Sequence, residues 1–150
     1  MFHNKMSRML QIVTVFGIIS LFMGLAIAGF RVPLKGSLGG DSSGFSGIVT
    51  HLGKFDGVFD PATLTAVWTA ANGDEVYVQT DSFELQVCLD PPDCDVFTYV
   101  QELTITGGTG RFENADGSGT VEGVFSFVNG IPDEFHGYLK GAITRPNSGR

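Results

Sequence analysis

The stretch "GGTGRFENADGSG", Gly107–Gly119, decides the fold because it separates two runs of alternating apolar residues. The run before it, "VFTYVQELTIT" (96–106), places four large apolar side chains on one face: Phe97, Tyr99, Leu103 and Ile105. The run after it, "GTVEGVFSFV" (119–128), alternates in the same way. Alternation with a period of two predicts β-strands with one buried face. The stretch is therefore predicted to be a corner between two strands.

This corner does not have the residues that known phosphate-binding, dinucleotide-binding or calcium-binding loops require. A phosphate-binding loop ends in Gly-Lys-Ser/Thr, whereas the chain has Gly110-Arg111-Phe112, and a dinucleotide fingerprint is followed by a helix. The run 114–117 lacks the alternating oxygen ligands of a calcium loop. Glycines permit a positive φ at a turn, and Phe112 and Ala115, three residues apart, can plug a barrel end. The predicted structural corner comprises Gly107, Gly108, Gly110, Phe112, Ala115 and Gly117.

The rest of the chain also predicts short strands and no convincing helix. Alternating runs cover 44–52, 54–59, 64–70, 75–89 (one strand or two) and 134–144. Asn-Gly pairs at 72–73 and 129–130 are typical of hairpin turns. About eight antiparallel strands in this length suit a closed barrel or a sandwich. We expect an all-β fold: a single eight-stranded antiparallel β-barrel over residues 44–145.

The N-terminal segment predicts export. Lys5 and Arg8 precede an uncharged apolar run from Met9 to Phe30, and Ala26-Ile27-Ala28 fits a signal-peptidase site. We expect residues 1–28 to be a helical signal peptide, the alternative being an uncleaved single-pass membrane anchor. Residues 29–43 are predicted to be a flexible lead-in, and 146–150 a frayed tail. The domain is then extracellular or periplasmic.

Charge and cysteine content limit the partners. Cleavage after residue 28 removes Lys5 and Arg8, leaving 7 of the 9 basic residues, all 16 acidic ones and a net charge of −9. Such a surface repels phosphate backbones, so no nucleic-acid partner and, after cleavage, no membrane contact is expected. Cys88 and Cys94, in "CLDPPDC", are predicted to form a structural disulfide in an oxidising compartment. Neither a metal site nor a cofactor is expected.

The corner resembles a known motif. "GGTGRFENADG" is similar to the GGTG-(K/R)-F-x-x-A-x-G corner of plant dirigent proteins and to that of allene oxide cyclases. The runs "VTHLGKFDG" and "WTAANGDEVYV" look like a group of small exported bacterial proteins assigned to the same calycin-like barrel. The resemblance, from about 51 to 123, implies an eight-stranded barrel with an apolar cavity. Because the family's active residues cannot be aligned here, it implies no catalytic residue.

Four residues are candidates for ligand binding. His51 is predicted to continue the strand face that presents Phe45 and Val49, so it is a candidate acid, base or ligand at the barrel mouth. Tyr99 and Gln101 lie on the apolar face of their strand, where their polar tips need partners. Trp68 is the only tryptophan and suits either core or pocket.

The sequence favours a non-catalytic function. We expect a module that binds a small apolar ligand or serves as a stable extracytoplasmic structural domain. One alternative is a cyclase or isomerase that confines a reactive lipid or phenolic intermediate. Another is an envelope-associated adhesion module. A homo-oligomer is compatible with each of these functions, and the sequence names neither the ligand nor the assembly.

Overall fold

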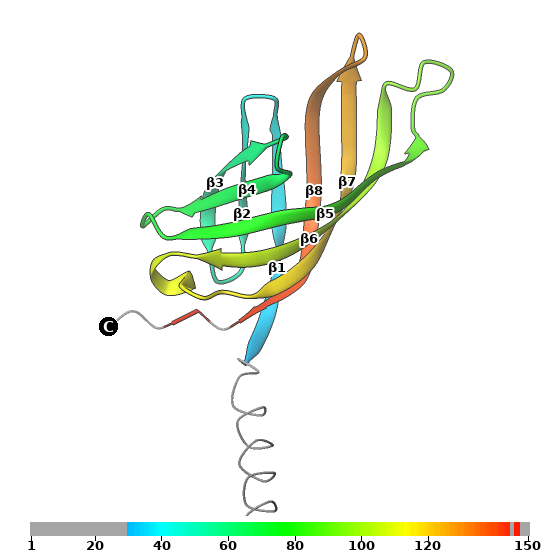
Figure 1. Cartoon of the computed structure of the whole chain (residues 1–150). Coiled ribbons are helices and arrows are strands. Elements are labelled where there is room, and N and C mark those ends of the chain that lie inside the picture. The colour runs from blue at the N-terminus through cyan, green and yellow to red at the C-terminus, as the bar shows by residue number, and fades with distance from the viewer. Residues whose placement is uncertain (1–29, 145, 148–150) are drawn as a thin grey trace, which may run out of the picture. The chain divides into compact units, whose positions relative to one another are not determined.

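The described part of the chain, residues 30–144 and 146–147 of a computed structural model, is an all-β closed barrel (Figure 1). Each strand pairs antiparallel with its neighbours in the sequence, and β1 pairs with β8 to close the ring. The predicted eight-stranded antiparallel barrel is confirmed. The strands are β1 (Arg31–Asp41), β2 (Gly44–Val49), β3 (Gly53–Asp60), β4 (Thr65–Ala70), β5 (Glu75–Cys88), β6 (Val96–Gly108), β7 (Gly117–Val128) and β8 (Ile131–Thr144).

The first strand corrects the prediction of a flexible lead-in over 29–43. Residues 31–41 form β1, which pairs with β8 from Arg31↔Thr144 to Asp41↔Glu134. The alternation was obscured because glycines occupy inward positions of this strand. A Cβ on Gly36 would overlap the carbonyl oxygen of Ile48, so close strand packing requires glycine there. The barrel therefore begins at Arg31 and not at residue 44.

The run 75–89 forms one long strand. β5 contains 14 residues and has register shifts against β6 at Tyr77/Val78, Thr80/Ser82 and Leu85/Cys88. Such bulges bend a strand and increase its twist without ending it. The expected number of strands was right, but their assignment was not. The run 75–89 contributes one strand, and β1 supplies the eighth.

The barrel interior contains a continuous apolar core. Inward-facing residues from all eight strands supply it, because side chains alternate between the two faces of a strand. The largest side chains that are fully buried are Tyr99, Phe112, Ile105, Leu139, Ile143, Val76 and Val121.

The predicted corner contains a single helical turn. The 3-10 turn η1 (Gly110–Phe112) follows β6, and its Phe112 is 1% exposed. Ala115 is also buried, so both apolar residues of the corner pack into the core cluster. Gly110 has a φ of +55°, which glycine adopts without a steric penalty. The corner lies at one end of the barrel (Figure 1).

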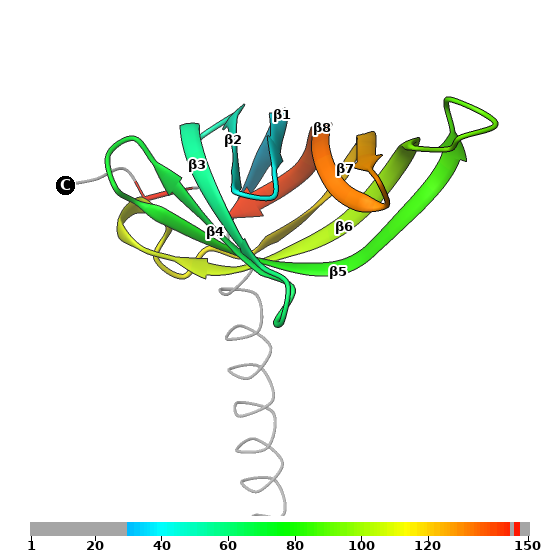
Figure 2. The same cartoon turned by 90° about the horizontal axis from the view of Figure 1, so that it is seen from above.

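Two hairpins extend the opposite end of the barrel. The β5–β6 and β7–β8 hairpins project beyond the other strands (Figures 1 and 2). The β5–β6 hairpin carries the Cys88–Cys94 disulfide, with the two Cα atoms 5.2 Å apart, which confirms the predicted pair. The expected signal peptide and most of the expected tail lie outside the described residues. In the described part, no helix has the length and apolarity needed to span a membrane.

Candidate functional site

Aromatic side chains line the extended end of the barrel. Phe125 is central, because the rings of Phe83, Tyr99, Phe127 and Phe135 all lie within 5.2–6.3 Å of its ring. Phe45 continues the cluster through Phe135, and Phe97 continues it through Phe127. We call this cluster the aromatic wall: Phe45, Phe83, Phe97, Tyr99, Phe125, Phe127 and Phe135.

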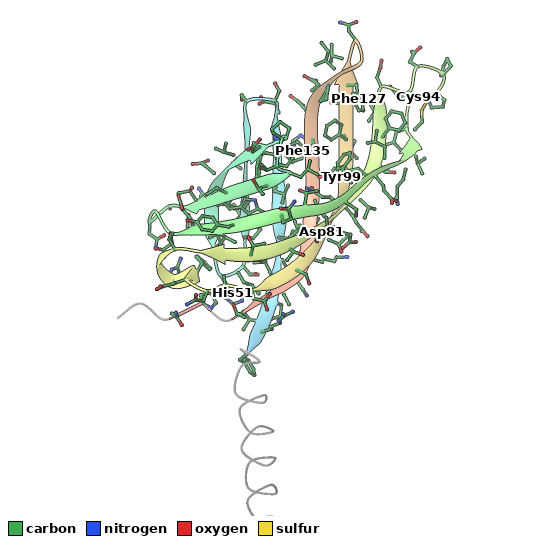
Figure 3. All side chains as sticks on the ribbon, in the orientation of Figure 1. His51, Asp81, Cys94, Tyr99, Phe127 and Phe135 are labelled. Carbon is green, nitrogen blue, oxygen red and sulfur yellow. A yellow bond between two sulfur atoms is a disulfide. The ribbon has the colours of Figure 1, made fainter. Side chains whose placement is uncertain are left out.

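The aromatic wall is only partly covered by the protein. Phe83 is 44% exposed, and Leu85 beside it on β5 is 39% exposed. Phe125, Phe127 and the remaining phenylalanines of the wall are half-buried. Figure 3 shows Phe127, Phe135 and Tyr99 toward the end of the barrel that carries Cys94. Aromatic surface of this kind, adjoining a packed core, can bind the flat or apolar part of a small molecule.

Tyr99 is the buried polar residue of the wall. Its side chain is 2% exposed, and the ring of Phe83 stacks on it with centroids 5.3 Å apart. Its hydroxyl has no hydrogen-bond partner among the described residues. Burial raises the pKa of this phenol to about 12, so the hydroxyl stays protonated at ordinary pH. Leaving a buried hydroxyl unpaired is costly, which makes Tyr99 a candidate ligand contact.

Two glycines give the Tyr99 ring its place. Tyr99 on β6 pairs with Gly123 on β7, which pairs in turn with Gly137 on β8. A Cβ on Gly137 would lie 2.5 Å from the Tyr99 hydroxyl oxygen. The ring therefore extends across β7 to β8 over surface that the glycines leave free. The sequence shows these glycines, but nothing in it indicated that they share one row with Tyr99.

Gln101 already has a partner. Its side-chain amide donates to the Thr80 hydroxyl at 2.8 Å, and the Thr80 backbone N–H donates to the Leu64 carbonyl. Thr80 is 8% exposed, so this pair is an internal polar link between β5 and β6. Gln101 lies one inward position from Tyr99, but its amide is already hydrogen-bonded to Thr80. Of the two predicted polar tips on this strand, only that of Tyr99 lacks a partner in the described structure.

Trp68 is a core residue. It is 3% exposed and stacks on Phe55 with centroids 5.0 Å apart. Phe55 contacts Phe45, so the core stack is continuous with the aromatic wall. Trp68 therefore packs behind the aromatic wall, through Phe55, and does not face a ligand at the wall.

His51 lies far from the aromatic wall. It is exposed in the turn between β2 and β3 with a φ of +68°, and Figure 3 shows it at the opposite end of the barrel. The prediction that it continues the face of Phe45 and Val49 is wrong. The strand ends at Val49, and the turn that follows breaks the alternation. The structure thus brings Tyr99 and Gln101 together and leaves His51 apart.

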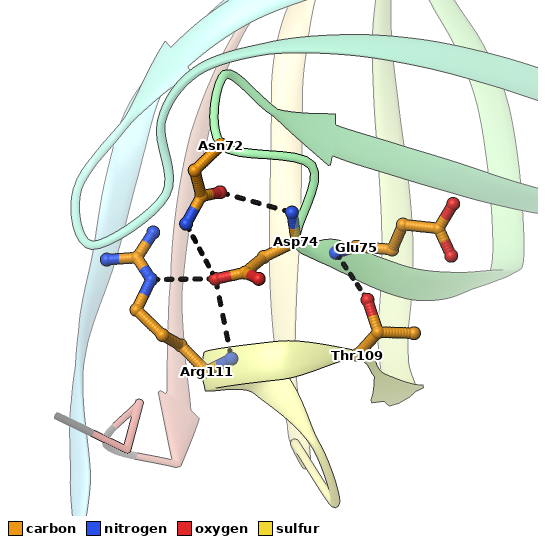
Figure 4. Close-up of polar contacts among 5 residues, drawn as sticks. All are labelled: Asn72, Asp74, Glu75, Thr109 and Arg111. Atoms are coloured by element: carbon orange, nitrogen blue, oxygen red, sulfur yellow. Dashed lines mark hydrogen bonds and ion pairs between the residues drawn. The ribbon is translucent and has the colours of Figure 1, made fainter. Parts of the chain in front are cut away.

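A polar cluster that the sequence did not suggest fixes the corner (Figure 4). The Asp74 carboxylate accepts from Arg111 Nε at 2.9 Å and from the Asn72 amide at 2.8 Å. The Arg111 hydrogen bond, followed by that of Asn72, holds the pKa of Asp74 below its usual range. The Glu75 N–H donates to the Thr109 hydroxyl at 3.0 Å. These contacts join η1 to the β4–β5 turn, and their role is structural.

A shallow groove of about 750 Å³ crosses the outer face of β1 to β4 and β8. Lys54, Asp56 and His136 contribute its charged or titratable side chains, and all three are exposed. Exposed groups of this kind are satisfied by water, so the groove provides a weaker candidate than Tyr99.

No family model, no curated protein and no solved structure matches this chain. In residues 30–144 and 146–147, no three His, Cys, Asp or Glu side chains gather as a metal ion would require. The side chains of the aromatic wall define what the protein itself can contribute to binding. They offer stacking surface, apolar contact and one neutral phenol that can donate or accept a hydrogen bond.

Proposed function

We propose that this protein binds a small, mostly apolar ligand at the aromatic wall, with Tyr99 supplying the polar contact. The observation that carries the proposal is the Tyr99 hydroxyl, which is buried and unpaired within the described residues. A ligand oxygen or nitrogen that reached it would replace a costly unpaired group by a hydrogen bond. The half-exposed rings of Phe83 and its neighbours would contact the apolar part of the same ligand.

Phe83 is the side chain that a ligand must displace or contact. It covers one face of the Tyr99 ring and is itself 44% exposed. A change of its rotamer would uncover Tyr99 without moving a strand, since exposed side chains change rotamer on a picosecond to nanosecond timescale. We therefore expect ligand entry past Phe83.

The binding test uses a matched pair of neutral probes, because the protein carries a net charge of −7 and would repel anionic dyes. One probe is 2-acetylnaphthalene, and the other is 2-isopropenylnaphthalene, in which a carbon replaces the carbonyl oxygen. Wild-type protein should prefer the ketone, relative to the Tyr99→Phe variant, by roughly three- to tenfold, the size of one hydrogen bond. The ratio of the Kd values of the two probes is compared between wild-type protein and Tyr99→Phe, because this comparison cancels the difference in hydration between the probes.

Position 83 provides the second arm. Phe83→Ala should weaken both probes equally, by about three- to tenfold, because an aromatic pair contributes about 0.5–1.5 kcal/mol. Val58→Ala is the control, since Val58 is 71% exposed on β3. If neither probe binds, or if Phe83→Ala and Val58→Ala behave alike, the ligand proposal fails. A folded barrel without binding would instead favour the structural-domain alternative.

The wider setting of the protein is part of the same proposal. The Cys88–Cys94 disulfide is consistent with an oxidising compartment, and the apolar N-terminal run supports export through a cleaved signal peptide. We assign the barrel to the allene oxide cyclase and dirigent type on the strength of its corner residues. Native mass spectrometry of the exported protein tests this setting, because it reports cleavage, the disulfide and any retained small molecule together.

A further inference from the structure

The chain contains two Asn-Gly pairs, and each lies in a turn between two strands. Asn72-Gly73 joins β4 to β5, and Asn129-Gly130 joins β7 to β8. All four residues are exposed. In such a pair the backbone nitrogen of the glycine can attack the side-chain amide carbon of the asparagine, because glycine has no Cβ to obstruct the approach. The two pairs share this reactivity, so their surroundings decide which of them reacts.

The first pair is held by hydrogen bonds. The Asn72 amide donates to the Asp74 carboxylate at 2.8 Å, and the Asp74 N–H donates to the Asn72 side-chain oxygen at 3.1 Å (Figure 4). Asp74 is fixed in turn by Arg111. The Gly73 N–H, which would have to lose its proton, donates to the Ala70 carbonyl at 2.9 Å. Attack at Asn72 would therefore require these hydrogen bonds to break.

The second pair lacks such bonds. In the described part of the chain, no hydrogen bond involves the Asn129 side chain or the Gly130 N–H. Figure 1 shows this turn at the tip of the extended β7–β8 hairpin. Beyond the register shift between Phe125 and Phe127, only two residue pairs close the hairpin, and residues 131–133 of β8 do not pair with β1. A hairpin end with so few contacts opens locally more readily than the body of a sheet.

We propose that Asn129 is a modification site, at which the protein deamidates spontaneously while Asn72 is protected. The Gly130 nitrogen gives its proton to hydroxide and forms a bond to Asn129 Cγ. The bond from Cγ to Nδ2 then breaks, and ammonia leaves with a proton taken from water. Water opens the resulting cyclic imide at either carbonyl, which gives aspartate or isoaspartate. Water is the only co-reactant, and nothing is oxidised or reduced.

The modification would change the tip of the hairpin in two ways. A carboxylate would replace a neutral amide, which adds one negative charge to a chain of net charge −7. Isoaspartate would also lengthen the backbone of the turn by one carbon and disturb the pairing of Val128 with Ile131. The modified fraction would rise with the age of the protein. This inference does not depend on the ligand proposed for the aromatic wall.

The first test compares the two asparagines within one protein. The full chain, with its disulfide intact, is incubated at mildly alkaline pH with and without urea and is then digested with trypsin. Asn72 and Asn129 fall in different tryptic peptides, 55–111 and 112–140, because no Lys or Arg interrupts either peptide. Mass spectrometry follows the replacement of NH2 by OH in each peptide, and fragment ions separate Asn129 from Asn114.

The native protein and the unfolded chain should give different ratios of the two rates. In native protein, Asn129 should react at least about tenfold faster than Asn72, the effect expected from the hydrogen bonds that hold Asn72. In urea the two rates should become equal, since both residues are then followed by glycine in an unfolded chain. Equal rates in native protein, or a faster reaction at Asn72, would overturn the proposal.

The second test removes the protection. Asp74→Ala deletes the carboxylate that accepts from Asn72 and should raise the Asn72 rate about three- to tenfold. Asn129 in the same variant is the control, and its rate should not change. Arg111→Ala keeps the turn sequence but frees Asp74, so it should also raise the Asn72 rate and replaces Asp74→Ala if that variant does not fold. Where Trp68 fluorescence shows a folded variant, an unchanged Asn72 rate or an equal rise at both asparagines contradicts the proposal.

Discussion

Tyr99→Phe should make the protein more stable, although it removes a polar atom from the interior. The hydroxyl is buried and has no partner among residues 30–144 and 146–147, so folding removes it from water without compensation. That desolvation costs about 1–3 kcal/mol. Deleting the oxygen leaves a void of roughly 10 Å³, which at about 24 cal/mol per Å³ lowers the free energy of unfolding by only about 0.25 kcal/mol. The expected net gain in the free energy of unfolding is about 1 kcal/mol, or about 4 °C in Tm.

The assay is urea and thermal unfolding followed by the fluorescence of Trp68, the only tryptophan, which is buried beside Phe55. Tyr138→Phe is the matched control, because Tyr138 is 47% exposed and should tolerate the change within about 0.5 kcal/mol. A loss of 1 kcal/mol or more in Tyr99→Phe would refute the reasoning. It would mean that the hydroxyl already has a hydrogen-bond partner in the unliganded protein and is not free to bind a ligand.

The pH dependence of stability at alkaline pH gives an independent readout of Tyr99. The pKa of Tyr99 is about 12 in the folded protein and about 10 in the unfolded chain, so above pH 10 the unfolded chain loses its proton first. The contribution of this group is therefore fully present below pH 10 and is lost as the pH rises toward 12. Wild-type stability should fall by up to about 2–3 kcal/mol more than that of Tyr99→Phe across this window. Parallel curves for the two proteins would contradict the assignment.

Three further predictions concern the corner and the disulfide. Phe112→Ala should lower the free energy of unfolding by about 3–5 kcal/mol in urea titrations, because the side chain is 1% exposed in the core; an effect below 1 kcal/mol would show that it does not plug the barrel. Asp74→Asn should remove part of the acid sensitivity: the lowered pKa of Asp74 stabilises the fold above about pH 4, and this contribution disappears as pH falls through the lowered value, which unfolding curves between pH 2 and 6 would detect. Replacing Cys88 and Cys94 together by serine should cost about 2 kcal/mol, from the short loop they close, while far-UV circular dichroism keeps its β-sheet signal; loss of that signal would mean that the loop is needed for folding.

The residues that alternate clearly allowed most of the barrel to be predicted. In β6, β7 and β8, large apolar residues that include aromatic ones recur on one face, so the sequence alone indicates which face is buried. β1 is less evident in the sequence because its inward positions hold no aromatic residue: two are Gly36 and Gly40, and the others are aliphatic. In β5, the bulges shift the alternation, and a period of two cannot show where it shifts.

The candidate site could be predicted only as a set of inward-facing residues. Tyr99 was assigned to the right face. Its lack of a partner, however, depends on how its ring lies over Gly123 on β7 and Gly137 on β8, and the sequence does not show that these glycines lie beside it. His51 was misplaced because a strand pattern was extended through a turn by two residues. The Asp74–Arg111 pair joins positions 37 residues apart, and neither residue lies in a motif that indicates the other.

The pairing of β1 with β8 has a consequence for how the protein is made. Arg31 lies opposite Thr144 in this pairing, so the ring is completed only by contacts between the first and last strands of the described chain. Contacts so distant in sequence slow folding, and a chain emerging in order from its N-terminal end holds seven strands before the eighth can close it. Until then β1 remains an open margin. Chaperone protection late in synthesis should therefore matter more for the yield of this protein than it does for one built from local contacts.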